Sequence, residues 1–495
     1  MATAFKRASG ILLPIFSLPG GAGIGGMGRQ AYQFIDFLKA AGQTYWQMLP
    51  LCPTGFGDSP YQSPSTFAGN PYFIDLEQLT EQGFLTPEGH SALPWGEDPS
   101  TVDYGLLYRG RRQVFERLFR RFAAAIPGDF ASFCAESADW LEDYALFMAI
   151  KDALGGIALA QWPPALRRRE AAALSEWAER CGDGVLYHKM LQYFFYKQWF
   201  ALKKYANSQG IQIIGDLPIY VSADSADVWA APQQFHLNKD LCPIEVAGCP
   251  PDAFTADGQL WGNPIYDWDA LRQTDYAWWK KRMALSLRIY DIIRIDHFRG
   301  FDSYYCIPFG AENARNGVWR KGPGMELFQS LQETLGDLPI IAEDLGFLTE
   351  SVRALLAESG FPGMKILQFA FDGEGGNEYL PHRYRPNSVC YTGTHDNDTL
   401  RGWLAHATPR ERQRALTYLQ GERTEELPRK MVLAALASVC DTCILPLQDV
   451  LGLGSEARIN IPSTLGQNWQ WRATALPDPR IAADLRYYTN LYERL

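Results

Sequence analysis

Short apolar runs rich in β-branched residues recur along this chain, and segments with helical spacing separate most of them. Each run ends in polar or small residues, which is typical of a buried strand that stops at a turn. Eight runs have this form and are expected to be strands: residues 11–13, 45–51, 211–216, 292–296, 339–343, 364–371, 388–392 and 442–447.

The segments between these runs place apolar residues three or four positions apart, as amphipathic helices do. The clearest is 186–207, where Leu191, Phe195, Trp199 and Leu202 share one face. The other expected helices cover 30–41, 327–335, 350–358, 409–420, 428–437 and 481–492. Because strand and helix alternate eight times, the pattern predicts an α/β fold, a closed (β/α)8 barrel of the TIM type.

The alternative to a barrel is a doubly wound sheet, which usually carries a phosphate-binding fingerprint after its first strand. The glycine-rich stretch 20–26 resembles such a loop, but it lacks the lysine of a phosphate loop and no sustained helix begins directly after it. The sequence therefore favours the barrel.

Two connections are too long to be simple crossovers. Residues 52–185 lie between the second and third strands, and residues 222–275 lie between the third and fourth. Both leave from strand C-terminal ends, the face where barrel enzymes place their active sites. We expect one barrel over 1–495, interrupted by an insertion subdomain at 52–185 and a covering loop at 222–275, which together wall a cleft. The alternative is that they serve only as decoration or as oligomer contacts.

Composition narrows the function classes. The chain has 495 residues and a formal net charge of −10 without long runs of like charge, which disfavours nucleic acid or an anionic membrane as a partner. It has no apolar stretch long enough to span a bilayer and no signal-peptide pattern at its start, so a cytoplasmic location is expected. Nine scattered Cys and seven His form no recognisable metal motif, so neither metal nor cofactor is expected.

The stretch 294–300 (RIDHFRG) delivers charge to the end of a buried strand. An ionised Asp296 is tolerable there only if cations hold it, and Arg294 and Arg299 flank it. We expect these arginines to depress the pKa of Asp296 and keep it ionised, as a nucleophile requires. The alternative is a purely structural ion pair.

Three more polar stretches end at the same rim if the strands are real. Asp216 follows the third strand, Glu343 and Asp344 the fifth, and 395–398 (HDND) the seventh. Several carboxyl groups in one pocket cannot all ionise easily, so their pKa values should split, leaving one protonated acid and one anion. Cleavage of a glycosidic bond with retention of the anomeric configuration needs one protonated carboxylic acid and one carboxylate anion.

These stretches also carry a family resemblance. In order and spacing, 216–221 (DLPIYV), 294–300 (RIDHFRG), 342–346 (AEDLG) and 394–399 (THDNDT) resemble the four signature regions of the amylomaltases, or 4-α-glucanotransferases, of the α-amylase clan. Residues 57–63 (GDSPYQS), 258–264 (GQLWGNP) and 448–458 (QDVLGLGSEAR) are similar to that family too, so the resemblance covers nearly the whole chain. Near the C-terminus, Ser463 stands where many relatives have Gly.

The resemblance implies a role for each site residue. Asp296 would be the nucleophile, Glu343 the general acid and base, and Asp396 the stabiliser of the transition state. Arg294 would hold Asp296 ionised, and Tyr61 would stack on the sugar. The other residues implied to bind substrate are Ser59, Asp216, Gln259, Trp261, His297, His395 and Asn468. Asp344 and Asp398 are better interpreted as supports of the neighbouring turns.

The expected function is transfer of α-1,4-glucan segments between maltooligosaccharides, with glucose among the acceptors, through a covalent glucosyl-enzyme intermediate. Three alternatives stay open: an α-glucan hydrolase with the same carboxylates, a catalytically silent glucan-binding protein, and a phosphate-binding barrel enzyme that would use the glycines at 452–454.

Overall fold

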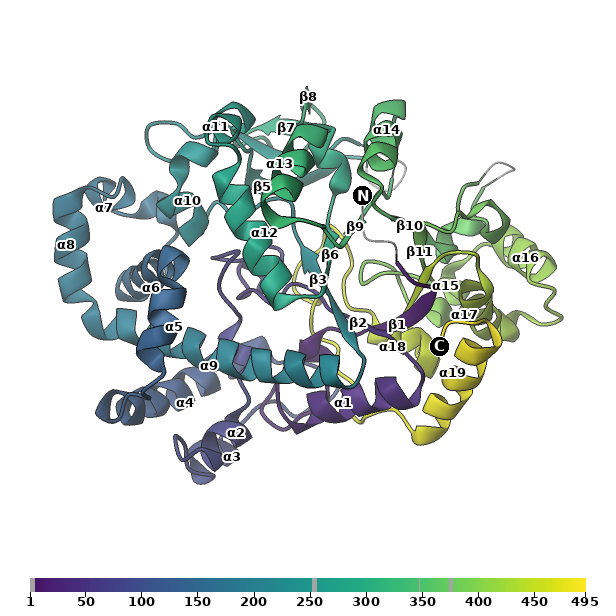
Figure 1. Cartoon of the computed structure of the whole chain (residues 1–495), viewed down its shortest axis with the longest axis horizontal. Helices are drawn as coiled ribbons and strands as arrows, with labels where there is room; N and C mark the ends of the chain where they lie inside the picture. The colour runs from purple at the N-terminus through teal and green to yellow at the C-terminus, as the bar shows by residue number, and fades with distance from the viewer. Residues whose placement is uncertain (1–4, 252–255, 347, 374–376) are drawn as a thin grey trace.

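The computed structural model describes residues 5–251, 256–346, 348–373 and 377–495. Eight parallel strands close into a barrel in the order β1-β12-β11-β10-β9-β6-β3-β2 (Figure 1). Their bounds are β1 Ala8–Leu12, β2 Tyr45–Gln47, β3 Gln212–Leu217, β6 Ile292–Ile295, β9 Ile340–Ala342, β10 Gly363–Ile366, β11 Ser388–Tyr391 and β12 Thr442–Pro446. All eight expected strands belong to this barrel, so the predicted fold is confirmed.

Most strand ends lie within one to three residues of the predicted ends, but β2 and β10 end four and five residues earlier than predicted. β2 ends at Gln47, before Pro50, a residue without the N–H that a barrel ladder needs. β10 ends at Ile366, and 367–370 form a single turn of 3₁₀ helix that carries Phe369 toward the cleft rim. In both places the apolar run continues past the strand because the residues that follow are buried as well: Leu49, Leu51, Leu367 and Phe371 are at most 3% exposed.

Apolar side chains from all eight strands form one buried cluster that fills the barrel. It includes Leu12, Tyr45, Ile214, Ile292, Ile341, Met364, Val389 and Ile444. Such a filled barrel is a packed core and not a pore, so the space for ligand lies above the strand ends. Trp46 and Trp199, expected in the core, are fully buried.

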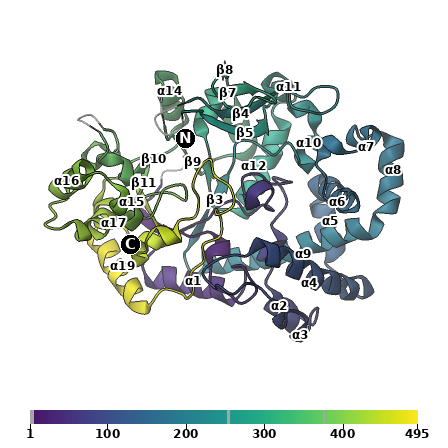
Figure 2. The same cartoon turned by 180° about the vertical axis from the view of Figure 1, so that it is seen from behind.

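Helices surround the barrel, with α15 to α19 on the side opposite α4 to α8 (Figure 2). Those that follow barrel strands include α1 Arg29–Ala40, α9 Gly182–Ser208, α12 Ala277–Ile289, α13 Met325–Leu335, α14 Glu350–Ser359, α15 Leu400–His406, α16 Pro409–Tyr418, α17 Leu427–Ala437, α18 Leu447–Leu451 and α19 Pro479–Leu491. In the described part of the chain, no helix is long and apolar enough to cross a membrane.

Between β2 and β3 the chain forms an outlying group of helices. These are α2 Leu76–Glu81, α3 Glu88–Ser91, α4 Tyr104–Ala124, α5 Phe130–Glu136, α6 Ala138–Ala153, α7 Pro164–Arg167 and α8 Ala171–Arg180. The long helix α9 joins them to the barrel. Near its start, His188 contacts Asp152 of α6 at 2.8 Å, and near its end, Tyr205 donates to Asp36 of α1 at 2.6 Å.

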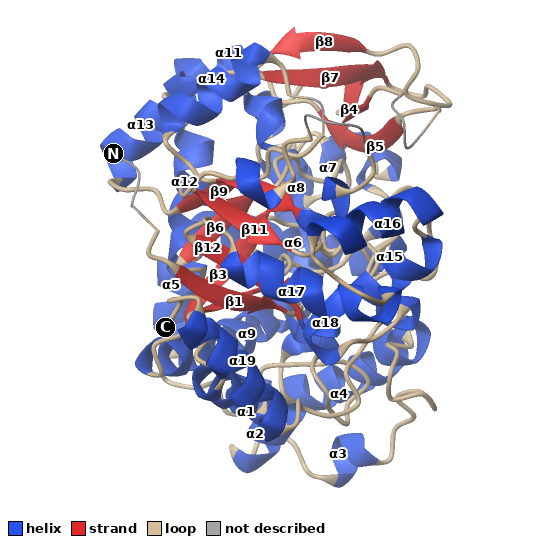
Figure 3. Ribbon diagram, turned by 90° about the vertical axis from the view of Figure 1, so that its right-hand side faces the viewer, coloured by secondary structure: helices blue, strands red, loops and turns tan. Residues whose placement is uncertain are grey.

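A second sheet, which the sequence did not predict, lies above one side of the barrel (Figure 3). Its antiparallel strands are ordered β5-β4-β7-β8, with bounds β4 Glu245–Cys249, β5 Gln259–Pro264, β7 Ser303–Pro308 and β8 Val318–Lys321. The short helices α10 Ala226–Ala230 and α11 Trp268–Gln273 flank the first pair. The second pair follows β6 and so lies outside both predicted insertions. The proposed division into one barrel and two insertions stays a prediction.

Candidate active site

A cleft of about 640 Å³ opens above the C-terminal ends of the barrel strands. Of the twelve residues predicted for the site, eleven line it: Ser59, Tyr61, Gln259, Trp261, Arg294, Asp296, His297, Glu343, His395, Asp396 and Asn468. Asp216 lies beneath them, only 2% exposed, and reaches the site through Tyr61 and Arg294. Separate strand ends therefore bring these residues to one place.

Arg294 lies between two carboxylates at the end of β6. Its Nη1 donates to both oxygens of Asp216 at 2.7 and 2.8 Å and to Oδ1 of Asp296 at 3.1 Å. The guanidinium is buried, and although burial lowers its pKa, Asp216 and Asp296 raise it well above the usual value. Arg294 is a permanent cation at the floor of the cleft.

The expected depressed pKa of Asp296 is wrong. Burial raises this pKa to about 6, because loss of hydration outweighs the attraction of Arg294 and because Asp216 and Asp396 add like charge. Moreover, Arg299 faces elsewhere: its guanidinium lies over the indole ring of Trp319, 3.9 Å from the centroid. Asp296 is still mostly anionic at neutral pH.

Glu343 lies next to Asp296 and titrates higher. Burial and, next, the negative charge of Asp296 together raise its pKa to about 8. Two backbone groups hold its carboxyl: His297 N donates to Oε2 at 2.7 Å, and Leu345 N donates to Oε1 at 3.1 Å. At neutral pH the pair therefore contains one protonated acid, Glu343, and one anion, Asp296.

The backbone at His297 makes the first of these contacts possible. Its φ of 54° is left-handed, an uncommon conformation for a residue with a side chain, and it turns the chain sharply at the end of β6. Burial lowers the imidazole pKa to about 4, so the ring is neutral. Its Nε2 is buried and meets no hydrogen-bond partner among the described residues, so its hydrogen-bonding capacity is unused.

Asp396 is held from the opposite wall of the cleft. Asn460 Nδ2 donates to its Oδ1 at 2.6 Å, His395 Nε2 lies 3.3 Å from the same oxygen, and Arg458 Nη2 donates to its backbone carbonyl at 2.7 Å. Asn460 was not predicted as a site residue. Its place at the start of the stretch 460–469, which contains the expected Asn468, was the available signal.

Tyr61 connects the two walls. Its hydroxyl donates to Asp216 Oδ2 at 2.7 Å and lies 3.0 Å from His395 Nε2. The ring stacks on His395 with centroids 5.4 Å apart and lies 5.7 Å from Trp469. Burial raises the pKa of Tyr61 well above 10, so the hydroxyl stays a donor.

The second sheet covers one side of the cleft with Gln259 and Trp261 of β5. The Trp261 ring meets His297 edge-on with centroids 4.8 Å apart, and its Nε1 donates to Gln259 Oε1 at 3.0 Å. The side-chain amide of Gln62 donates to the Trp261 carbonyl at 3.1 Å. This contact ties the cover to the segment that carries Tyr61.

Ser59 and Asn468, both predicted to bind substrate, form hydrogen bonds within their own loops. Ser59 Oγ accepts from Tyr61 N at 3.2 Å. Asn468 Oδ1 accepts from Ile461 N at 2.9 Å, and its Nδ2 donates to the Thr464 carbonyl at 2.9 Å. Both line the cleft, but their polar atoms are partly used.

Asp344 and Asp398 brace backbone beside the site, as expected. Asp344 Oδ1 accepts from Met364 N at 2.6 Å, and Asp398 Oδ1 accepts from Thr399 N at 2.8 Å.

Exposed apolar side chains that the sequence did not single out lie at the cleft rim: Phe56, Leu260, Trp319 and Leu465. Phe56 and Leu465 are 75% and 67% exposed. They occupy polar loops and strand edges, where hydrophobic periodicity gives no signal. Rings and apolar surface at the rim of a polar cleft suit the apolar faces of sugars.

A parallel eight-stranded barrel whose strand ends bring separate carboxyl groups to one cleft defines the class of barrel enzymes that act on glycosidic bonds. Comparison with known proteins narrows the class. Residues 13–477 match the family model described as 4-alpha-glucanotransferase, and the chain belongs to this family, glycoside hydrolase family 77, also called the amylomaltases. It is an enzyme of this kind, and its substrates are α-glucans.

The relatives are similar over nearly their whole length. The chain is 48% identical to the 4-alpha-glucanotransferase of Clostridium butyricum, covering 93% of this chain and 95% of the relative. It is also 48% identical to the enzyme of Thermus thermophilus, covering 99% of each. Amylomaltase from Streptococcus agalactiae, solved in complex with acarbose, superposes with a TM-score of 0.96 at 45% identity, covering 99% of this chain and 100% of that one.

Proposed function

We propose that this enzyme transfers α-1,4-glucan segments between maltooligosaccharides by a retaining double displacement. The observation that supports this most directly is the split of the carboxyl pair, with the pKa of Asp296 at about 6 and that of Glu343 at about 8. A neutral solution then presents a nucleophile and an acid together in one cleft, as the first half-reaction requires.

In the first half-reaction, an Asp296 carboxylate oxygen attacks the anomeric carbon of the donor. The bond from that carbon to the glycosidic oxygen breaks, and Glu343 gives its proton to the departing oxygen. The products are a shortened glucan with a free 4-hydroxyl and a covalent glucosyl ester on Asp296. Asp396 would stabilise the positive charge that develops on the sugar.

In the second half-reaction, Glu343 acts as a base. It takes the proton of the acceptor's 4-hydroxyl, whose oxygen attacks the anomeric carbon and releases Asp296. Two inversions at one carbon give net retention. The two backbone N–H groups that contact Glu343 stabilise the carboxylate that the first half-reaction leaves behind. Its side chain therefore stays in position until it takes the acceptor's proton and becomes an acid again.

Sugar hydroxyls would be bound by His297 and His395 in the reactive subsite, with Arg294 keeping Asp296 charged. The unpaired, neutral His297 Nε2 supports the first assignment. Asp216, predicted to bind substrate, is buried beneath the cleft and would act through Tyr61 and Arg294, which occupy its carboxylate oxygens. Tyr61 would stack on the same sugar, and Ser59 and Asn468 would contact it from their loops. Gln259 and Trp261 would cover the neighbouring unit.

The main competing function is hydrolysis with the same carboxylates. A sugar 4-hydroxyl rather than water reaches the intermediate when apolar side chains and a cover exclude solvent, and the rim and the second sheet supply both. Incubation with maltotriose distinguishes the two. We expect a ladder of longer maltosaccharides with retained anomeric configuration; shortening alone would assign the enzyme as a hydrolase. Independence from nucleic acid, membranes and cofactors, and a cytoplasmic location, stay predictions.

A further inference from the structure

Two buried polar residues at the start of α18 have no role in the mechanism above, although they begin the sequence stretch 448–458. Gln448 and Asp449 follow β12 and are only 4% and 6% exposed. Neither is among the residues that line the catalytic cleft. Buried polar side chains are nearly always hydrogen-bonded, so the partners of these two indicate what they do.

Asp449 connects the two ends of the loop that carries Asp396. This loop starts at Thr392, directly after β11, and ends at Leu400, the first residue of α15. Asp449 Oδ2 accepts from Thr392 Oγ1 at 2.6 Å, and Asp449 Oδ1 accepts from Leu400 N at 2.7 Å. The two oxygens of one carboxylate therefore set the distance between the loop ends.

The Asp449 carboxylate is buried but still mostly ionised at neutral pH. Burial raises its pKa to about 6, while Thr392 and Leu400 lower it by donating hydrogen bonds. Hydrogen bonds to an ionised acceptor are roughly twice as strong as those between neutral groups. Because Thr392 and Leu400 are at most 1% exposed, removing the carboxylate leaves two buried donors without their acceptor.

Gln448 holds the other segment that meets Asp396. Its Nε2 donates to the Ala457 carbonyl at 3.2 Å, directly before Arg458. Arg458 and Asn460 are the residues that donate to the backbone and to the carboxylate of Asp396. Adjacent residues of α18 thus hold both chain segments that determine where Asp396 lies.

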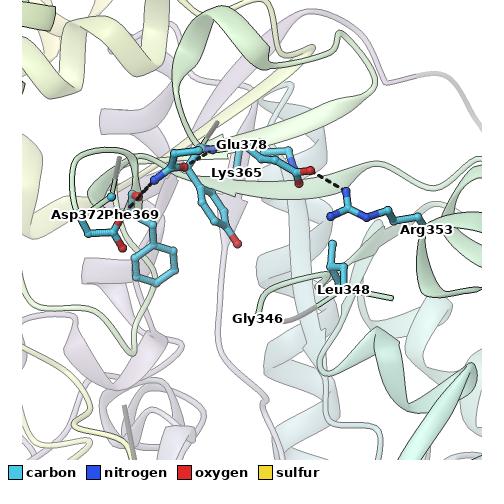
Figure 4. A pocket seen from close by; sticks show the side chains of 10 residues that line it. Gly346, Leu348, Arg353, Lys365, Phe369, Asp372 and Glu378 are labelled. Carbon is cyan, nitrogen blue, oxygen red and sulfur yellow. Dashed lines mark hydrogen bonds and ion pairs between the residues drawn. The ribbon is translucent and has the colours of Figure 1, made fainter. Parts of the chain in front are cut away.

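The strand on the other side of β11 supports the same loop. β11 lies between β12 and β10 in the barrel. After β10, Gln368 Nε2 donates to the Asp398 carbonyl at 2.7 Å. Gln368 precedes Phe369, which lines a second pocket shown in Figure 4. The loop is therefore held from both neighbouring strands, and Asp449 is the contact that joins its two ends.

We propose that Asp449 is a positioning residue for Asp396: by joining Thr392 to Leu400, it holds the loop in the conformation that directs the Asp396 carboxylate into the cleft. The proposal rests on the proposed role of Asp396 in stabilising positive charge on the sugar. That charge develops only in the transition state, so a displaced Asp396 lowers kcat and leaves donor binding nearly unchanged. A displacement of about 1 Å lowers a rate by about 10²-fold.

The variant Asp449→Ala, assayed by disproportionation of maltotriose, tests this. We expect kcat to fall about 10–100-fold while KM changes by less than about threefold. The matched control is Asp291→Ala, directly before β6 at the N-terminal ends of the strands. The Asp291 carboxylate likewise accepts from a backbone N–H, that of Ile213 at 2.8 Å, and from a side chain, Asn207 Nδ2 at 2.8 Å. The control should lower Tm and keep the wild-type kcat. A wild-type kcat in Asp449→Ala, or equal losses of kcat in both variants, overturns the proposal.

A second experiment distinguishes positioning from a general loss of stability. With α-maltosyl fluoride as an activated donor, Asp396→Asn should retain a measurable rate. Adding Asp449→Ala should change that rate by less than about twofold, because the residue through which Asp449 acts is already disabled. Fully additive losses overturn the proposal. If Asp449→Ala does not fold, Thr392→Val takes its place in both experiments; it removes one of the two contacts and should lower kcat about three- to tenfold.

The same variants separate this proposal from the function it rests on. An Asp396→Asn variant that turns over maltotriose at the wild-type rate would overturn the role of Asp396, and the positioning role of Asp449 with it. An impaired Asp396→Asn together with a fully active Asp449→Ala would overturn the positioning role alone.

Discussion

The backbone N–H of His297 donates to Oε2 of Glu343 at 2.7 Å, so the residue that follows the proposed nucleophile also positions the proposed acid. Because of the left-handed turn at His297, its N–H points from the end of β6 toward Glu343 at the end of β9. The two carboxyl groups are therefore positioned by one turn, and their separation does not depend on a flexible loop.

Replacing Glu343 with Gln should lower transfer from maltooligosaccharides by about 10²–10⁴-fold, because the leaving oxygen loses its proton donor. Fluoride departs without protonation, so the variant should still form an ester on Asp296 with α-maltosyl fluoride, detectable by mass spectrometry. Glu326→Gln, which disturbs a surface ion pair with Arg272 at 2.8 Å, is the control. Wild-type transfer by Glu343→Gln would contradict its assignment as the acid.

The dependence of kcat/KM on pH should be a bell. Activity needs Asp296 ionised and Glu343 protonated, so it should rise through about pH 6 and fall through about pH 8. The two apparent values belong to the coupled pair. Initial rates with maltotriose from pH 4 to pH 10 measure them. A rate that keeps rising above about pH 9 would mean that Glu343 is not the acid.

Stability should also depend on pH through these groups. The folded-state pKa of Glu343, about 8, lies above the ordinary value of about 4.3. The contribution of its protonation to the free energy of unfolding is fully present below about pH 4.3 and is lost as the pH rises to about 8. The Tm of Glu343→Gln relative to wild type should therefore increase between pH 5 and pH 8. Asp296→Asn should show the same sign over a narrower window that ends near pH 6, and a flat difference for both would contradict the raised pKa values.

Removing the Asn460 side chain should impair catalysis more than binding. Asn460→Ala deletes the 2.6 Å hydrogen bond to Asp396 Oδ1 and leaves that oxygen with the longer contact to His395 Nε2 at 3.3 Å. We expect kcat to fall about 5–150-fold, the effect of losing one charge-assisted hydrogen bond of about 1–3 kcal/mol, with KM changed less. Asn387→Ala, at a surface asparagine that donates to the Gly360 carbonyl, is the control. An equal effect of both substitutions on kcat would exclude a positioning role.

Tyr61→Phe separates the hydroxyl of this residue from its ring. The hydroxyl donates to buried Asp216 and contacts His395, so its loss should lower kcat/KM by about 5–150-fold. Tyr61→Ala should lower it further because the ring packing is lost as well. Tyr487→Phe, at an exposed tyrosine, is the control. If the Phe variant is as active as wild type, the hydroxyl network is not needed.

The sequence predicts the barrel well because each of its strands is buried on both faces and reads as an apolar run. Ile213 and Ile214, for example, point to opposite sides of β3 and are both fully buried. Strand ends then identify Asp296 and Glu343 by simple adjacency. The second sheet gives no such signal, because all four residues of β8, from Val318 to Lys321, are exposed.

The pKa of Asp296 could not be predicted from the charged residues that are close to it in sequence. Arg299 is only three residues away in sequence, yet the turn at His297 sends it to the ring of Trp319. Burial, which depends on the whole fold, then outweighs the remaining cation. Asn460 was missed for a related reason, since its partner Asp396 lies 64 positions away in the chain.

The topology of the second sheet determines which other residues must be exchanged together with it. Its hairpins leave the barrel on either side of β6, one from the connection after β3 and one from the connection before β9. A graft that moves this cover intact between relatives has to span both hairpins, and the segment between them encodes Arg294 and Asp296. Recombination that exchanges the second sheet therefore also exchanges the segment that contains Asp296.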